Sequence, residues 1–161
     1  GLGLGYTAAT VLDDERVRRL DVVDALAPVI SWHEQGLVPL GPRLSGDPRC
    51  RFVHGDFFGW VLDAGEEAER LDAVVVDIDH SPRHLLHPDH ARFYTADGVA
   101  RIAARLRPGG VFALWSNDPP DEEYLAMVRA VMPDVAAEVV TFPDAWGARV
   151  ATNTVYVATT P

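Results

Sequence analysis

The chain opens on a glycine-rich turn, with Gly1, Gly3 and Gly5 at alternate positions. Glycine adopts a left-handed backbone without strain and lets a ligand approach the main chain closely. Such a turn typically joins a buried strand to a nucleotide-binding helix, and an apolar 3.6-residue period over residues 7–20 predicts that helix. We therefore expect a strand of about 5–8 residues before Gly1, so that residues 1–161 are a single domain truncated at its N-terminus.

Strand-like and helix-like stretches alternate along the rest of the chain. Strands are expected at residues 21–24, 51–54, 71–77 and 111–115, and helices at residues 28–34, 57–62, 92–106 and 121–132. Two further strands, at residues 137–142 and 152–158, follow without a helix between them. The pattern predicts an α/β fold, a Rossmann-like doubly wound mixed sheet with an antiparallel edge.

Residues 71–77 form an apolar, β-branched run without alternation, which predicts a central strand buried on both faces. In doubly wound sheets, ligands bind beyond the carboxyl ends of the strands. Acidic residues at those ends are therefore candidate site residues, and the sequence has three of them: Asp24, Asp56 and Asp77.

Each of these acids has a functional and a structural interpretation. Asp24 lies 19 residues after Gly5, where a carboxylate can accept hydrogen bonds from ribose hydroxyls, but it also fits an ordinary helix entry. Asp56 would accept from an adenine amino group or cap a helix. Asp77 would take a proton from an attacking amine or position a cation, or it would tie down its loop.

Six segments, in this order and at this spacing, resemble motifs of the spermidine synthase-like branch of the class I S-adenosylmethionine-dependent methyltransferase superfamily: residues 1–8, 22–24, 55–56, 75–77, 93–95 and 106–111. The resemblance implies a seven-stranded sheet and S-adenosylmethionine, or its decarboxylated form, as cofactor. It also implies that Gly1, Gly3 and Gly5 hold the amino-acid end of the cofactor. Asp77 would contact the cofactor and serve as base or positioning residue, and Tyr94 would bound the substrate pocket.

Two departures from the family pattern bear on the reaction. Spermidine synthases resemble one another in an acid at the position of Leu4, which repels the carboxylate of S-adenosylmethionine, and in an Asp-x-x-Asp motif after the central strand. Here Asp77 matches the first acid of that motif, His80 stands at the second, and Asp79 falls one residue early. We therefore expect methyl transfer to a small nucleophile, with aminopropyl transfer and a non-catalytic assembly domain as alternatives.

Charge narrows the range of partners. The net charge is −10, which repels phosphate backbones and suits a small cationic substrate, so we expect no nucleic-acid partner. The single cysteine, Cys50, excludes an internal disulfide and fits a cytoplasmic location. No apolar run is long enough to span a membrane. The oligomeric state stays open, with a homodimer as one option.

Two groups of residues are interpreted structurally. Four histidines crowd the stretch after the central strand, at positions 80, 84, 87 and 90, and we interpret this stretch as a polar lid over the substrate without a metal. A Mg²⁺ site formed by Asp77, Asn117 and Asp118 is the alternative. The tryptophans, at positions 32, 60, 115 and 146, are expected to pack in the fold, with Trp115 the residue best placed for recognition.

Overall fold

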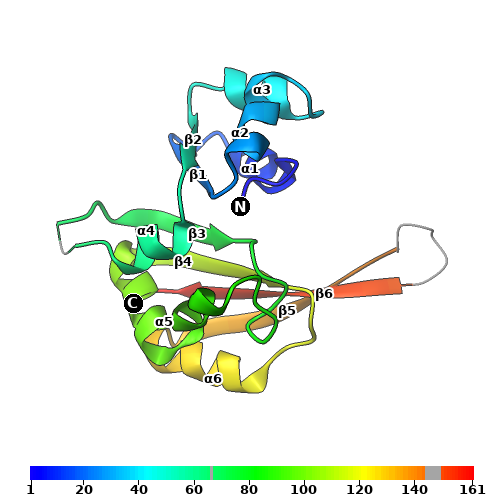
Figure 1. Ribbon diagram of the computed structural model, residues 1–161. Coiled ribbons are helices and arrows are strands. Elements are labelled where there is room, and N and C mark those ends of the chain that lie inside the picture. The colour runs from blue at the N-terminus through cyan, green and yellow to red at the C-terminus, as the bar shows by residue number, and fades with distance from the viewer. Residues whose placement is uncertain (66, 144–149) are drawn as a thin grey trace. The chain divides into compact units, whose positions relative to one another are not determined.

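The computed structural model describes residues 1–65, 67–143 and 150–161. The chain divides into two compact units, Gly1–Trp60 (unit 1) and Val61–Pro161 (unit 2). Helix α4, Phe57–Leu62, spans the boundary between them (Figure 1). Each unit contains one sheet.

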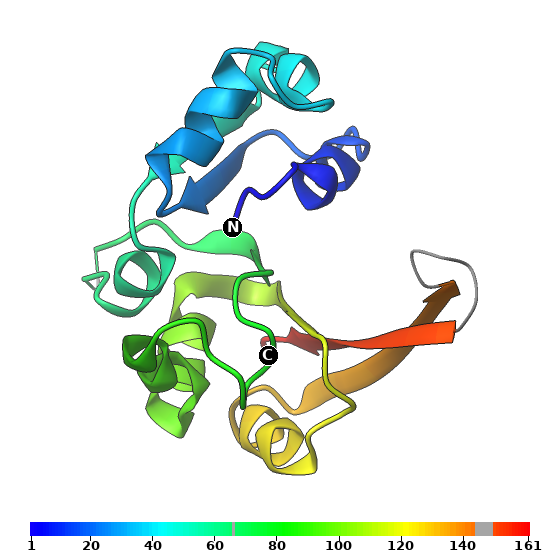
Figure 2. The same ribbon diagram turned by 45° about the vertical axis from the view of Figure 1, so that its right-hand side comes forward.

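Unit 1 is a parallel pair of strands with three short helices (Figure 2). Its elements are α1 Tyr6–Leu12, β1 Leu20–Asp24, α2 Ala27–Glu34, α3 Gly41–Gly46 and β2 Cys50–His54. The pairing of β1 with β2 runs from Leu20 opposite Cys50 to Asp24 opposite His54, so the carboxyl ends of both strands lie side by side. An apolar core that includes the fully buried Leu44 joins the helices to the strands.

The helix predicted over residues 7–20 was too long, because α1 ends at Leu12. The carboxylate of Asp14 accepts the backbone N–H of Arg16 at 2.9 Å, a local hydrogen bond that competes with helix continuation. The guanidinium of Arg49 then donates to three carbonyls of this loop, those of Leu12, Asp14 and Val17 at 2.8, 3.4 and 3.2 Å. These hydrogen bonds satisfy backbone carbonyls of the irregular loop that follows α1. Their donor, Arg49, lies far along the chain from this loop.

Most of the other elements in this part of the chain follow the prediction closely. Strands β1 and β2 and helices α2 and α4 form where the sequence indicated. Pro28 lies in the first turn of α2, and Gly36, at φ 68°, follows its end in the left-handed conformation that glycine tolerates. Helix α3 was not predicted.

Unit 2 is a four-stranded mixed sheet with two helices along one face (Figures 1 and 2). Its elements are β3 Leu71–Val76, the 3₁₀ helix η1 Pro88–Tyr94, α5 Ala96–Arg105, β4 Leu106–Ser116, α6 Glu122–Val131, β5 Asp134–Pro143 and β6 Val150–Thr159. The strand order is β3-β4-β6-β5, with β3 parallel to β4 and the remaining pairs antiparallel. The predicted α/β fold with a mixed sheet and an antiparallel edge is confirmed.

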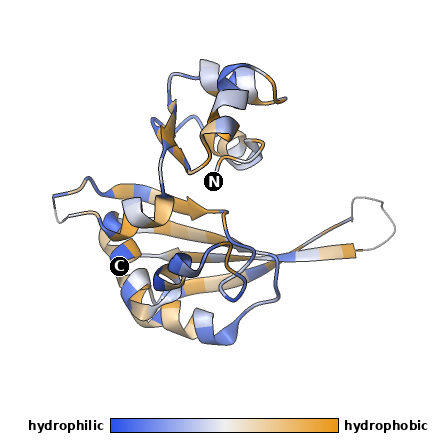
Figure 3. Ribbon diagram, in the orientation of Figure 1, coloured by the Kyte–Doolittle hydropathy of each residue, from blue (hydrophilic) through white to orange (hydrophobic). Residues whose placement is uncertain are grey.

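Strand β3 is buried on one face only, which corrects the prediction of burial on both. It is the first strand in the four-stranded order, and its side chains alternate: Val74 and Val76 are buried, whereas Val75 is 47% exposed. Val76 pairs with Leu114, and Leu114 with Tyr156, and this row is buried in the core. The ribbon of β3 is coloured mostly hydrophobic along its length (Figure 3), so hydropathy alone did not distinguish the buried face from the exposed one.

The helix predicted over residues 92–106 begins later, at Ala96, after the separate helix η1. Thr95 caps α5 by accepting the N–H of Gly98 at 3.1 Å. A Cβ at Gly98 would lie 2.4 Å from the carbonyl oxygens of Arg92 and Phe93, so this glycine permits the tight junction between η1 and α5. At the other end, α5 stops at Arg105, one residue before the predicted end, and Leu106 begins β4.

The last elements agree with the sequence. Asp121 caps α6 by accepting the N–H groups of Glu123 and Tyr124, both at 3.0 Å, and β5 and β6 form the predicted hairpin. No helix in the described part of the chain has the length and hydropathy of a membrane span. Trp146 lies outside the described residues. Trp32 and Trp60 are partly exposed, so they pack less completely than expected.

Candidate functional site

The glycine turn of unit 1 has the left-handed geometry that its sequence predicted. Gly3 has φ 47° and Gly5 has φ 88°, and the N–H of Gly5 closes the turn on the carbonyl of Leu2 at 2.8 Å. A Cβ at Gly3 would meet no described atom within 4 Å, so the backbone there is open to close approach. Leu4, between the two glycines, is 54% exposed.

Asp24 is tied directly to this turn. One carboxylate oxygen of Asp24 accepts the N–H of Leu2 at 2.7 Å, and the other accepts the N–H of Leu26 at 2.8 Å. Each carboxylate oxygen can accept a second hydrogen bond, and Asp24 is only partly buried. The structure therefore brings together the glycine turn and Asp24, two of the predicted site elements. The carboxylate of Asp24 can still accept further hydrogen bonds.

Asp56 follows the neighbouring strand β2 and acts as a helix cap. Its two carboxylate oxygens accept the N–H groups of Phe58 and Gly59, both at 3.0 Å. Helix capping is the alternative that the sequence left open for this residue. Asp56 is also exposed, so its remaining lone pairs face away from the core.

In unit 2, Asp77 and Asp79 have opposite environments. Asp77 directly follows β3 and is exposed, and its side chain makes no hydrogen bond or ion pair with any residue that the structure describes. Asp79, two residues later, has a fully buried carboxylate. The free acid of this loop is therefore Asp77, the residue predicted to act on the substrate.

The carboxylate of Asp79 organises the segment that follows β3. It accepts the N–H of Leu86 and Nδ1–H of His90, both at 2.8 Å, and the phenol of Tyr94 at 3.0 Å. Burial, together with the negative charge of Asp79, raises the pKa of Tyr94 far above its ordinary value. Tyr94, the predicted wall of the substrate pocket, is therefore a neutral and largely buried donor.

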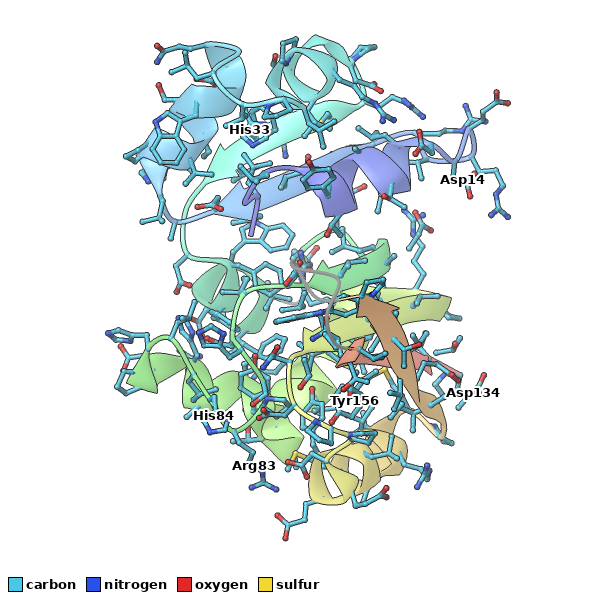
Figure 4. All side chains as sticks on the ribbon, turned by 90° about the vertical axis from the view of Figure 1, so that its right-hand side faces the viewer. Asp14, His33, Arg83, His84, Asp134 and Tyr156 are labelled. Carbon is cyan, nitrogen blue, oxygen red and sulfur yellow. The ribbon has the colours of Figure 1, made fainter. Side chains whose placement is uncertain are left out.

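A second set of contacts holds the same segment to the loop after β4. Asp118 accepts hydrogen bonds from Ser81 at 2.6 Å and from His84 at 2.7 Å, and these bonds hold the pKa of Asp118 below its ordinary value. Arg83 pairs with Asp121 and Glu123, with closest distances of 2.5 Å. Arg83 and His84 lie next to each other, as labelled in Figure 4.

Contacts within the protein occupy two of the three groups considered for a metal, Asn117 and Asp118, whereas Asp77 stays exposed. Asp118 is bound by Ser81 and His84, and the side-chain oxygen of Asn117 accepts from Asn153 at 3.3 Å. Within residues 1–65, 67–143 and 150–161, no three His, Cys, Asp or Glu side chains are grouped as metal ligands. In the histidine-rich segment, His84 and His90 bind carboxylates of the protein itself.

Comparison with known proteins finds similar sequences and similar folds. No protein-family model matches the chain. The polyamine aminopropyltransferase of Prochlorococcus marinus (strain MIT 9313) is 30% identical over 119 residues, and that of Shewanella oneidensis is 24% identical over 127 residues. Each alignment covers 74% of this chain but only 39% and 21% of the respective relatives, so the chain spans well under half of either protein.

The solved structures agree with the sequence matches. A spermidine synthase from Thermotoga maritima superimposes with a TM-score of 0.71 at 18% identity, over all of this chain and 52% of that one. Human methyltransferase-like protein 13, solved in complex with SAH, has a TM-score of 0.68 at 19% identity, over all of this chain and 69% of that one. The chain is spermidine synthase-like. Its fold is that of the class I methyltransferases, as predicted.

The two residues at which this spermidine synthase-like chain differs from the motifs of its branch, Leu4 and His80, are both exposed. Leu4 occupies the outer part of the glycine turn, and His80 is exposed. The backbone of His80 is held by neighbours, since its carbonyl accepts from Asn117 at 2.7 Å and its N–H donates to His84 at 3.1 Å. Asp79 is buried beside it and so does not replace the acid missing at position 80.

Sequence reasoning on this spermidine synthase-like chain missed two structural roles. It treated Asp79 as a misplaced motif acid, although a tyrosine and a histidine follow within 15 residues as potential partners. It also passed over His33, which lies in α2 and binds the glycine turn. A lone histidine in a short helix carries no sequence signal that would single it out.

Proposed function

We propose that this chain forms the cofactor-binding part of a transferase that moves an alkyl group from S-adenosylmethionine, or from its decarboxylated form, to a small amine. In unit 1, Gly1, Gly3 and Gly5 would hold the amino-acid end of the cofactor, Asp24 the ribose and Asp56 the adenine. A sulfonium cofactor supplies an activated carbon when bound, so the protein's task is mainly alignment and proton removal.

One observation carries this proposal: the bond between the N–H of Leu2 and the carboxylate of Asp24, at 2.7 Å. It joins a left-handed glycine turn to an acid at the carboxyl end of a parallel strand, the pairing that dinucleotide- and nucleoside-binding folds use. The residues present suit such a ligand, because Gly3 has open space around it and Asp24 keeps lone pairs for hydroxyl donors.

In unit 2, we assign Asp77 and Tyr94 to the acceptor. Asp77 is exposed and free of described side-chain partners, so its carboxylate can orient an ammonium group or accept the proton that an attacking amine loses. Tyr94 would bound the acceptor pocket through its ring, because its phenol is engaged by Asp79.

Aminopropyl transfer is the first candidate reaction. The sequence alone had favoured methyl transfer, with aminopropyl transfer as an alternative. Both relatives are polyamine aminopropyltransferases, and one similar structure is a spermidine synthase in complex with the transition-state analogue AdoDATO. A net charge of −10 also favours the approach of a cationic polyamine. We therefore propose a polyamine-type acceptor and cytoplasmic action.

Methyl transfer is the second candidate, and Leu4 is the observation that favours it. Leu4 is 54% exposed at the turn and has no charge to repel the carboxylate of intact S-adenosylmethionine. The two candidates therefore differ in which form of the cofactor the turn accepts.

The deciding experiment is calorimetric titration of the full-length protein with each form of the cofactor. Tighter binding of the decarboxylated form supports aminopropyl transfer, and tighter binding of the intact form supports methyl transfer. Binding of neither form would refute the proposal and leave a non-catalytic assembly domain.

Two variants sharpen the result. Leu4→Glu should weaken binding of intact S-adenosylmethionine by roughly 5- to 10-fold through charge repulsion, while Leu4→Gln serves as the uncharged control of the same size. Asp77→Asn should retain cofactor binding and lose turnover. If Asp77→Asn turned over acceptor at the wild-type rate, Asp77 would have no part in the reaction.

A further inference from the structure

A fully buried histidine, His33, forms a hydrogen bond to the backbone of the glycine turn. His33 lies in α2 with no exposed surface, and its side chain turns inward toward the strands (Figure 4). Its Nε2 is 3.0 Å from the carbonyl oxygen of Gly3. The ring also packs on Phe52 of β2, with 5.6 Å between ring centroids. His33 thus connects the core of unit 1 to the backbone of the turn.

The chemistry of this contact fixes the tautomer of His33. A carbonyl oxygen only accepts hydrogen bonds, so Nε2 must carry the proton and donate it to Gly3. The other ring nitrogen, Nδ1, is buried and has no hydrogen-bond partner within the described part of the chain. Among those residues, the bond to Gly3 is therefore the polar interaction that the imidazole makes.

The surrounding backbone is shaped to admit the ring. A Cβ at Gly5 would lie 2.8 Å from Cε1 of His33 and 2.4 Å from Cδ1 of Leu44. A Cβ at Gly41 would lie 2.7 Å from the backbone carbonyl oxygen of His33. All three distances are shorter than real Cβ contacts, so Gly5 and Gly41 make room for the histidine and its helix.

We propose that His33 is a positioning residue that sets the Gly3–Gly5 turn for the cofactor, an inference that rests on the proposed function. Asp24 fixes the turn through the N–H of Leu2, and His33 fixes it one residue later through the carbonyl of Gly3. The two side chains hold consecutive residues of the turn from different elements. This leaves the open side of Gly3 presented to the ligand.

The test compares three variants of the full-length protein. His33→Leu removes the donor, and His33→Gln restores an N–H that can reach the same carbonyl. Ile30→Ala, one helical turn away in α2 and also buried, reproduces a loss of packing in the same core but removes no hydrogen bond to the turn. The readouts are amide hydrogen exchange of the peptide covering residues 2–8 without cofactor, and the dissociation constant for S-adenosylmethionine and its decarboxylated form.

We expect His33→Leu to speed exchange in that peptide and to weaken cofactor binding about 3- to 10-fold, the worth of one hydrogen bond. His33→Gln should restore both values, and Ile30→Ala should leave the affinity at the wild-type value. In turnover assays the acceptor KM should stay constant. Equal cofactor affinity in wild type and folded His33→Leu would overturn the positioning role, whereas failure of the wild type to bind either cofactor form would refute the proposed function instead.

The wild-type protein provides a measurement that does not depend on a variant folding. Nitrogen-15 spectra of the histidine side chains should show His33 as the Nε2–H tautomer at neutral pH, with resonances that shift when cofactor is added. An Nδ1–H tautomer would contradict the bond to Gly3 and overturn the proposal.

Discussion

The phenol of Tyr94 donates a hydrogen bond of 3.0 Å to the carboxylate of Asp79, which is fully buried. The same carboxylate accepts bonds of 2.8 Å from Leu86 and His90. A single side chain therefore holds three points of the segment between β3 and α5. The exposed acid Asp77 lies just before this anchored segment, so its position depends on Asp79.

Replacing Asp79 with Asn should lower the free energy of unfolding by about 1–3 kcal/mol, because a buried charged acceptor of three hydrogen bonds becomes a neutral amide. Urea titration of the full-length protein measures this value. Asp77→Asn is the matched control, and as an exposed residue it should change stability by less than about 0.5 kcal/mol. Equal losses in the two variants would contradict the role assigned to Asp79.

Stability should fall at alkaline pH partly through Tyr94, whose pKa is raised by burial. A tyrosine in the unfolded chain loses its proton near pH 10, whereas the folded protein keeps it. The contribution of Tyr94 to the free energy of unfolding is therefore complete below about pH 10 and is lost as pH rises above that value. Unfolding titrations from pH 8 to 11 should show a shallower decline for Tyr94→Phe, and an unchanged slope would count against the assignment.

Gly5→Ala should destabilise the protein more than Gly3→Ala. Both glycines have positive φ, but a Cβ at Gly5 meets Leu44 at 2.4 Å, whereas a Cβ at Gly3 meets nothing within 4 Å. Strain alone costs about 1–2 kcal/mol, and overpacking adds about 1–3 kcal/mol at Gly5. Thermal melts of both variants measure the two losses of stability, with Gly46→Ala as an uncrowded control at ordinary φ. A loss in Gly3→Ala equal to or larger than that in Gly5→Ala would contradict this ranking.

Asp121→Ala should cost about 1–2 kcal/mol at neutral pH, because Asp121 caps α6. Hydrogen bonding from Arg83 lowers the pKa of Asp121, so its contribution is present above about pH 4 and is lost as pH falls below that value. The difference between wild type and variant should accordingly shrink in acid. A difference that stays constant from pH 7 to pH 2.5 would refute this linkage.

Arg49→Lys should destabilise unit 1 by about 1–3 kcal/mol, since an ammonium group cannot serve the three carbonyls that the guanidinium reaches. Hydrogen exchange of the loop between α1 and β1 should rise in the same variant. Arg16→Lys is the control, because Arg16 is almost fully exposed, and it should leave both quantities unchanged. Similar behaviour of the two variants would show that charge alone matters at Arg49.

Features encoded by neighbouring residues were predictable from the sequence. Asp121 followed by two glutamates indicated the start of α6, and the glycines indicated the left-handed turn. The two strands without an intervening helix indicated the hairpin. In each case, the residues that make the structure lie within a few positions of one another, so composition and spacing were sufficient.

Features that depend on distant partners were not predictable. The end of α1 depends on Arg49, and the place of Tyr94 depends on Asp79. The burial of one face of β3 depends on strands and helices that follow it in the chain. For Asp56, the sequence left ligand binding and helix capping open, and the structure shows the cap while the role toward adenine stays a prediction.

The link between Arg49 and the loop after α1 has a consequence for synthesis on the ribosome. Arg49 follows Leu12 by 37 residues, which at roughly 5–20 residues per second corresponds to a delay of about 2–7 seconds. During that interval the carbonyls of Leu12, Asp14 and Val17 lack the guanidinium group that they bind in the folded protein. We expect helix α1 to stay incompletely ordered until β2 has been synthesised. Unit 1 would then fold in one late step rather than progressively during its synthesis.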